Sequence, residues 1–158
     1  MTGASTYVAV VGGDPADPAA LEVAERVGRS LGQRSCILVC GGLGGVMEAA
    51  CRGAKATGGT TIGILPSLDR ASANPYVDIA IPTGMGEMRN ALIVRGVDGL
   101  IAVGGGFGTL SEIALALKAG KPVIGLDTWP LAAPSSSADP IVRAGDPDEA
   151  VEELLSRL

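Results

Sequence analysis

The sequence predicts an α/β protein built on a single doubly wound, Rossmann-like parallel sheet with helices on both faces. Short, almost wholly apolar runs alternate along the chain with longer amphipathic stretches of helical period. Strands of such uniform apolarity are typical of a parallel sheet that is covered on both sides. Glycine clusters follow several of the apolar runs and precede the amphipathic stretches, where a strand must turn into a helix. At 158 residues, we expect one domain over residues 1–158.

The first half of the chain predicts three strands, each ending near glycine or proline. The helix after the first strand has two candidate starts, Asp14-Pro15 and Asp17-Pro18, because each offers an N-cap residue followed by proline at N1. The predicted elements are the strands YVAVVGG (7–13), CILVC (36–40) and TTIGILP (60–66), the helices ALEVAERVGRSLG (20–32) and VMEAACRGAKATG (46–58), and a loop over 66–75.

The second half continues the alternation and ends in a helix. Asp146, Pro147 and Glu149 form a predicted capping box with proline at N1, which marks the start of that helix. The apolar helix containing IALALKA (113–119) has too few polar positions to face solvent, so we expect it in the core or at a subunit interface. The other elements are the strands YVDIAIPT (76–83), GLIAVGGG (99–106), KPVIGL (121–126) and IVRA (141–144), the helix EMRNALIVRG (87–96), and a long loop over 127–140.

Composition excludes several classes of function. The net charge of −5 argues against a broad nucleic-acid-binding or membrane-binding surface, since both need a basic field. The chain contains no histidine, which excludes Ser-His-Asp and Cys-His catalysis and removes the commonest zinc ligand, so we expect no metal site. Cys36, Cys40 and Cys51 form no CxxC pair and are interpreted as buried, reduced thiols of a cytoplasmic protein. No secretory signal or membrane-length apolar run is evident.

Three glycine clusters are the candidate ligand-binding loops. In a doubly wound sheet, ligands bind beyond the carboxyl ends of the strands, where glycine allows close backbone approach and helix N-termini attract anions. The alternative is that the glycines only make tight turns. Neither the G-x-G-x-x-G dinucleotide motif nor the P-loop motif fits any cluster. The candidate residues are Gly12 and Gly13, then Gly41, Gly42 and Gly45, then Gly105, Gly106, Phe107, Gly108 and Thr109.

Two charged residues are candidates for chemistry at the same edge. Thr109 and Glu112 have the spacing of a capping box, so Glu112 is either a helix cap or a functional carboxylate, and early in a helix we expect it to be ionised. Arg89 lies early in a predicted helix, where its charge opposes the helix dipole. Arg89 is therefore either paired locally with Glu87 or reaches over the sheet edge to a phosphate or to Glu112.

The segments GGLGGVMEAACRGAKATGGTTIGILP and MRNALIVRGVDGLIAVGGGFGTLSEIALALKAGKPVIGL resemble the LOG-like family. This family includes cytokinin-activating phosphoribohydrolases, proteins once labelled lysine decarboxylases, and molybdenum-cofactor carrier proteins. The resemblance covers about residues 5–127, and the GGxGTxxE match is its most specific part. It implies that Gly105, Gly106, Gly108 and Thr109 hold a 5′-phosphate and that Arg89 and Glu112 are the catalytic pair.

Two departures from the phosphoribohydrolase motif favour the carrier-type subgroup. Gly104 stands where that branch has proline, and Asn90 stands where it has lysine after the arginine. The first hypothesis is a carrier-like protein that binds a nucleoside monophosphate or a molybdopterin-type cofactor, with no cofactor required for chemistry. The second is a phosphoribohydrolase that cleaves the N-glycosidic bond of a nucleoside 5′-monophosphate. A pyridoxal-phosphate decarboxylase is disfavoured, because the usual site needs a histidine. The resemblance also implies a homo-oligomer, a dimer or a dimer of dimers.

Overall fold

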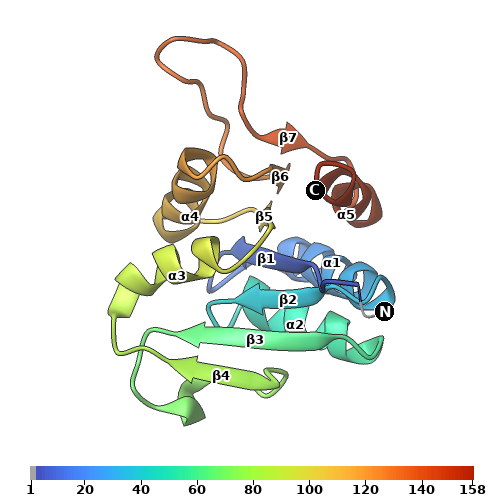
Figure 1. Cartoon of the computed structure of the whole chain (residues 1–158), viewed down its shortest axis with the longest axis vertical. Coiled ribbons are helices and arrows are strands. Elements are labelled where there is room, and N and C mark those ends of the chain that lie inside the picture. Colours follow the sequence, from blue (N-terminus) through green and yellow to red (C-terminus); the bar gives the residue numbers. More distant parts are fainter. Residues whose placement is uncertain (1–2) are drawn as a thin grey trace.

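The computed structural model describes residues 3–158, which form a seven-stranded, wholly parallel sheet with helices on both faces (Figure 1). The predicted fold class is confirmed. The strand order is β4-β3-β2-β1-β5-β6-β7. The chain therefore builds outward from β1 to β4, then returns to the other side of β1 and builds outward again from β5 to β7. The crevice between β1 and β5 is the topological switch point, where α/β sheets bind ligands.

The observed elements match the predicted order, with differences at their ends. The strands are β1 (Tyr7–Gly12), β2 (Ile37–Cys40), β3 (Thr60–Leu65), β4 (Ile79–Pro82), β5 (Gly99–Val103), β6 (Val123–Leu126) and β7 (Val142–Arg143). The helices are α1 (Pro18–Gln33), α2 (Val46–Ala56), α3 (Asn90–Arg95), α4 (Phe107–Lys118) and α5 (Pro147–Leu155), with 3₁₀ turns η1 (Arg70–Ser72) and η2 (Gly86–Arg89).

Capping decides where two of the helices begin. Asp17, the second of the two candidate starts, is the N-cap of α1, and its carboxylate accepts a hydrogen bond from the backbone N–H of Ala20. The predicted cap of α5 is confirmed, since Asp146 accepts from the N–H groups of Asp148 and Glu149. The prediction of a helix over 87–96 is wrong for its first turn. That turn belongs to the 3₁₀ turn η2, and α3 begins only at Asn90.

The buried side chains form one cluster on each side of the sheet. Successive residues of β1 alternate between them: Val8 and Val10 pack under α1, α2 and α5, and Ala9 and Val11 pack under α3 and α4. This alternation explains why the strand is apolar throughout, because both of its faces are covered. The apolar helix α4 has Ile113 and Ala116 buried in the second cluster, as expected of a core helix.

The three cysteines are free and buried, as predicted from their spacing and type.

The long loop between β6 and β7 extends away from the sheet in Figure 1. The Arg143 guanidinium holds the two ends of this loop together. It donates to the backbone oxygens of Thr128 and Trp129 and pairs with Asp139. Within residues 3–158, no helix combines the length and apolarity needed to cross a membrane.

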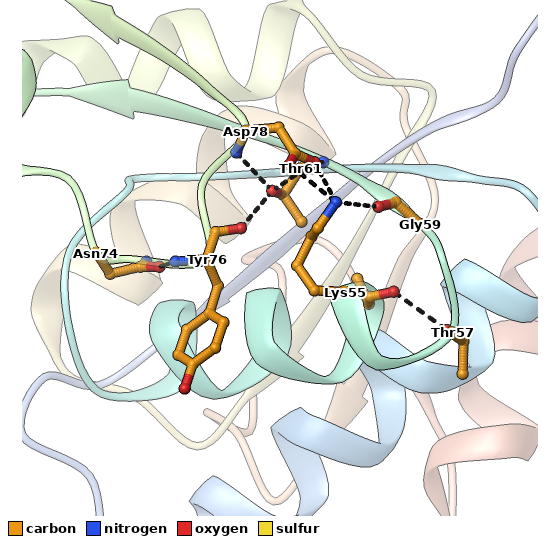
Figure 2. Close-up of polar contacts among 8 residues, drawn as sticks. Lys55, Thr57, Gly59, Thr61, Asn74, Tyr76 and Asp78 are labelled. Atoms are coloured by element: carbon orange, nitrogen blue, oxygen red, sulfur yellow. Dashed lines mark hydrogen bonds and ion pairs between the residues drawn. The ribbon is translucent and has the colours of Figure 1, made fainter.

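Polar contacts hold the chain that enters β4 against α2 and β3 (Figure 2). The Lys55 ammonium at the end of α2 lies 2.8 Å from an Asp78 carboxylate oxygen and also donates to the backbone oxygen of Gly59. The other Asp78 oxygen accepts from the backbone N–H of Thr61, whose hydroxyl donates to the Tyr76 carbonyl. These contacts link α2, β3 and the chain entering β4.

Helices α1 and α2 cross so closely that glycine is required at the contact. A Cβ atom built on Gly28 would lie 1.9 Å from the backbone oxygen of Ala50, and one built on Gly53 would lie 1.9 Å from the backbone oxygen of Glu25. Both obstacles are backbone atoms, so neither helix can yield by a side-chain rotation.

We therefore expect Gly28→Ala to lower the free energy of unfolding by about 1–3 kcal/mol, because the added methyl group forces the helices apart. Helix propensity alone predicts the opposite sign, a gain of about 1 kcal/mol. Urea denaturation of the two proteins measures the difference. Arg26→Ala, on the exposed side of the same helix, is the control, and a stabilised Gly28→Ala would contradict the close crossing.

Candidate functional site

The three glycine clusters meet at the carboxyl edge of the sheet, beside the β1–β5 switch point. The backbone N–H of Val46, at the start of α2, donates to the Gly13 carbonyl over 3.0 Å. A Cβ on Gly12 would lie 2.5 Å from the backbone oxygen of Val103, the last residue of β5. The loops after β1, β2 and β5 are thus in mutual contact, as the sequence predicted.

The loop between β2 and α2 depends on a residue that sequence reasoning missed. Gly42 and Gly45 have positive φ angles of 77° and 61°, which favour glycine. Asn74 holds this loop in place, because its backbone N–H donates to the Gly42 carbonyl at 2.8 Å and its side-chain amide donates to the Leu43 carbonyl at 2.9 Å. Asn74 lies in a segment expected to be loop, and no motif distinguishes it there.

The loop between β5 and α4 is held by the chain that follows β6. Gly104 and Gly105 have φ angles of 54° and 108°. The Thr128 hydroxyl donates to the Gly104 carbonyl at 2.6 Å, and the Trp129 indole N–H donates to the Gly106 carbonyl at 3.1 Å. These contacts fix the backbone just before α4.

The capping-box interpretation of Thr109 and Glu112 is wrong. Helix α4 begins at Phe107 with Gly106 as its N-cap, and no side chain caps it. Thr109 is therefore already inside the first turn, where its buried side chain packs against Gly105: a Cβ on that glycine would lie 2.4 Å from the Thr109 side chain. The capping signal misled because the helix starts earlier than the spacing suggests.

The N-terminus of α4 is electrostatically different from those of the other long helices. Aspartates cap α1 and α5, and α2 has Glu48 in its first turn. The carboxylate of Asp14 also faces the α2 terminus, since a Cβ on Gly44 would lie 3.1 Å from it. Among the helices of eight or more residues within 3–158, only α4 has neither a capping side chain nor an acidic residue in its first turn. Its free N–H groups are therefore open to an external anion.

A pocket of about 260 Å³ lies next to this terminus. Its walls come from the ends of β1 and β2, the start of α2, and the first two turns of α4. Apolar side chains of Leu43, Met47 and Pro66 form part of the lining. The predicted site residues that line it are Gly12, Gly41, Arg89, Gly108, Thr109 and Glu112.

The remaining predicted residues lie outside that lining. Gly13, Gly42 and Gly45 shape the two loops described above, and Gly105 and Gly106 precede α4. Phe107 is 80% exposed, and its ring lies 5.4 Å from the Trp129 ring, so the two aromatic side chains pack on each other at the surface.

Glu112 is the most unusual group in the pocket. Glu112 is only 9% exposed, and among residues 3–158 its carboxyl group forms no hydrogen bond or ion pair, so its oxygens open onto the pocket. Burial raises the pKa of the Glu112 carboxyl to about 7, although the nearby Arg89 charge acts in the opposite direction. The expectation that a position early in the helix lowers the pKa of this carboxyl group is therefore wrong, because its desolvation raises the pKa instead.

Arg89 reaches the pocket from η2 and is itself buried. Its Nε–H donates to the Ile64 carbonyl at 2.8 Å, one terminal nitrogen donates to the Asn90 side chain, and the other donates to the Gly41 carbonyl at 3.4 Å. It forms no ion pair within 4.0 Å with Glu87, so the local salt-bridge interpretation is wrong for the described residues.

Both the oxygen and the nitrogen of the Asn90 side-chain amide form hydrogen bonds with other protein groups. Its oxygen accepts from Arg89, and its nitrogen donates to the Ser111 hydroxyl at 3.1 Å. Arg89 and Glu112 do converge on one pocket, as expected, but without direct contact. Within residues 3–158, no group of three or more His, Cys, Asp or Glu side chains is arranged to hold a metal ion.

Residues 5–151 match the model of the SLOG cluster4 family. The chain belongs to this family. A relative from Mycobacterium tuberculosis, named cytokinin riboside 5′-monophosphate phosphoribohydrolase, is 32% identical over 139 residues, which are 82% of this chain and 74% of that protein.

Solved structures give similar matches over nearly the whole chain. The molybdenum cofactor binding protein from the phototrophic bacterium Rippkaea orientalis superposes with a TM-score of 0.89 at 38% identity, covering 99% of both chains. The molybdenum cofactor carrier protein from Chlamydomonas reinhardtii superposes with a TM-score of 0.81 at 36% identity, covering 97% of this chain and 99% of that one. The resemblance to the LOG-like family, including its carrier-type members, is thereby confirmed.

Glu112 predicts a specific pH dependence of stability. Its pKa is about 7 in the folded protein and 4.5 ordinarily, so its contribution is fully present below about pH 4.5 and is lost as the pH rises through about 7. The loss amounts to about 3 kcal/mol. Because glutamine cannot ionise, we expect Glu112→Gln to be more stable than wild type at about pH 8, and the difference to shrink towards about pH 4.5.

Urea denaturation across this pH range measures the difference, with Glu22→Gln on the exposed side of α1 as the control. A difference between Glu112→Gln and wild type that does not change with pH would show that the carboxyl group titrates as it does in water.

Proposed function

We propose that the protein binds a phosphorylated heterocyclic ligand, a nucleoside 5′-monophosphate or a molybdopterin-type cofactor, at the carboxyl edge of the sheet and holds it as a carrier. One observation supports this above the others. Among the long helices of residues 3–158, only α4 has an open, acid-free N-terminus, and it borders a pocket onto which the Glu112 carboxyl group opens without a protein partner. A ligand that enters the pocket would therefore meet both free backbone donors and a free carboxyl group.

The parts of the ligand fit different parts of the pocket. Its phosphate would accept hydrogen bonds from the backbone N–H groups at positions 107–109, which have no acceptor within the helix. Its ring would lie against the apolar side chains of Leu43, Met47 and Pro66. Arg89 would add a positive charge beside the phosphate while holding the Gly41 backbone.

Two solved structures that match nearly the whole chain favour the carrier hypothesis, since both proteins are named for binding or carrying the molybdenum cofactor. The chemistry of the pocket favours it as well. Asn90 replaces the lysine of the hydrolase motif, and its amide is occupied by Arg89 and Ser111. The pocket therefore holds one cation where the hydrolase motif implies two.

The second candidate function is hydrolysis of a nucleoside 5′-monophosphate. The relative named as a phosphoribohydrolase supports it, as does the presence of Glu112 and Arg89 in one pocket. In this reaction water adds to the anomeric carbon, the N-glycosidic bond breaks, and the base leaves with a proton. A carboxyl group whose pKa is near 7 can exchange that proton and can stabilise the cationic sugar when ionised.

The phosphate position is tested by placing a charge at the N-cap of α4. Gly106 has an extended backbone, and nothing lies within 4 Å of a Cβ built there, so the position accepts a side chain. We expect Gly106→Asp to weaken binding of GMP and AMP by about tenfold or more, because the carboxylate occupies the free N–H groups and repels phosphate.

Gly106→Asn is the matched control, since asparagine caps the helix equally well without the charge. Titration calorimetry of both variants with both nucleotides separates repulsion from capping. Unchanged affinity in Gly106→Asp would show that the phosphate does not bind at the N-terminus of α4, and absence of binding by the unchanged protein to these nucleotides and to molybdopterin would overturn the proposal.

The choice between carrier and hydrolase is tested by base release. We expect no free adenine or guanine, measured by chromatography, when AMP or GMP is incubated with the protein at saturating concentration. Base release that falls at least about 100-fold in Glu112→Gln, while nucleotide affinity is kept, would establish the hydrolase instead.

A further inference from the structure

The only phenylalanine and the only tryptophan of the chain contact each other at the surface. Phe107 is the first residue of α4 and is 80% exposed, and the centre of its ring lies 5.4 Å from that of the Trp129 ring. In a chain with only 3% aromatic residues, two of them thus meet at one exposed position. We call Phe107 and Trp129 the aromatic pair. Aromatic side chains at a surface are typical of binding sites, where flat rings stack on them.

Protein contacts hold the Trp129 side of the aromatic pair beside the N-terminus of α4. The Trp129 indole N–H donates to the carbonyl of Gly106, the N-cap of that helix, at 3.1 Å. The Arg143 guanidinium donates to the Trp129 backbone oxygen at 2.6 Å and to the Thr128 backbone oxygen at 3.1 Å. Because the protein already orders Trp129, a ring that stacks on the aromatic pair costs little additional conformational entropy.

The aromatic pair and the candidate pocket lie on different sides of the α4 N-terminus. Thr109 and Glu112 line the pocket, whereas Phe107 does not, and the Glu112 carboxyl group opens onto it without a partner among residues 3–158. Successive helical residues advance by about 100° around the helix axis, so the side chains of Phe107 and Thr109 point in nearly opposite directions. The free N–H groups at the start of α4 lie between them. A ligand that reaches from the pocket to the aromatic pair therefore has to cross the open N-terminus.

We propose that the aromatic pair is a subsite for a second ring, so that the ligand is a dinucleotide whose two ring systems are joined through a diphosphate. The part of the ligand that crosses the N-terminus meets free backbone donors, which favours an anionic linker. A diphosphate is such a linker, because each of its phosphates carries both a negative charge and an ester bond.

The size of the pocket supports a ligand that extends beyond it. Its volume of about 260 Å³ lies below the range of about 300–1,000 Å³ that is typical of ligand pockets. The first ring and its phosphate would fill the pocket, and the second ring would lie outside it on the aromatic pair. This inference rests on the proposed function, since it requires a phosphate at the N-terminus of α4.

The second ring is tested with two diphosphate diesters of equal charge. GppG, in which a diphosphate joins two guanosines 5′ to 5′, offers a second base, and GDP-glucose offers a sugar in its place. We expect titration calorimetry to show about tenfold tighter binding of GppG, because a base that stacks on an aromatic side chain contributes about that factor. GMP is the reference for occupation of the pocket alone.

Substitutions at Phe107 show whether this preference comes from stacking. Phe107→Ala should abolish the preference for GppG over GDP-glucose, and Phe107→Tyr should keep it, because tyrosine retains the aromatic face. Phe107→Leu, which keeps an apolar side chain without that face, should behave as Phe107→Ala does. Leu68→Ala, at another exposed apolar residue, is the control and should leave the preference unchanged.

Trp129 provides a second readout, since it is the only tryptophan of the chain. Its fluorescence should be quenched more strongly by saturating GppG than by saturating GDP-glucose, because only the second base of GppG contacts the aromatic pair. Equal affinities for these two probes, or a preference that survives in Phe107→Ala or Phe107→Leu, would overturn the subsite and leave the aromatic pair as a surface for a protein partner. GMP binding without either effect would overturn only this subsite, whereas a protein that binds none of the three probes would contradict the proposed function as well.

Discussion

The structure depends on how closely three backbone segments approach one another at the end of β1. A side chain at Gly12 would overlap both the Val103 carbonyl, at 2.5 Å, and the Val46 side chain, at 2.6 Å. One residue later, the Gly13 carbonyl accepts the first free N–H of α2. This contact sets the start of α2 and the end of β5 at fixed positions around β1. The pocket between them exists because nothing larger than hydrogen fits where the segments meet.

An acidic protein has to build an anion site mainly from backbone groups. In the proposed site this depends on the placement of carboxylates as much as on the placement of cations. Aspartates satisfy the N-termini of α1 and α5, and Asp14 and Glu48 lie at that of α2. The N-terminus of α4 is left without them. Among the long helices of residues 3–158, three begin beside acidic groups and one, α4, does not, so the proposed anion would be directed to the N-terminus of α4, since like charge disfavours the others.

Burial of Glu112 works against stability, because its carboxyl group loses much of its hydration and gains no hydrogen bond from the described residues. Such uncompensated groups are typical of binding and catalytic sites. Arg89 is the counterpart of Glu112: its positive charge is equally buried, but its donors are satisfied by backbone carbonyls of β3 and the β2–α2 loop. One charged group is therefore held rigidly by the protein, and the other remains free to respond to what enters the pocket.

The sequence by itself determined the fold class, the order of the elements, and the edge at which the glycine loops gather. These follow from local properties: apolar runs, N-cap residues such as Asp17 and Asp146, and glycines at strand ends. It also pointed to Arg89 and Glu112 as residues of one site. It could not define the start of α4, since Thr109 has the right type and spacing for a cap but the backbone is already helical at Phe107.

Only the tertiary structure decided the rest. The protonation behaviour of Glu112, the occupied amide of Asn90, and the support that Asn74 gives to the Gly42–Leu43 backbone all depend on neighbours distant in the sequence. The exposure of Ile79 and Ile81 on β4 belongs to the same group. The sequence predicts a sheet covered on both faces, and only the path of the chain after β4 leaves these two side chains exposed. The local sequence pattern shows which residues are apolar enough to favour burial, but only the packing of all the elements determines which of them are buried.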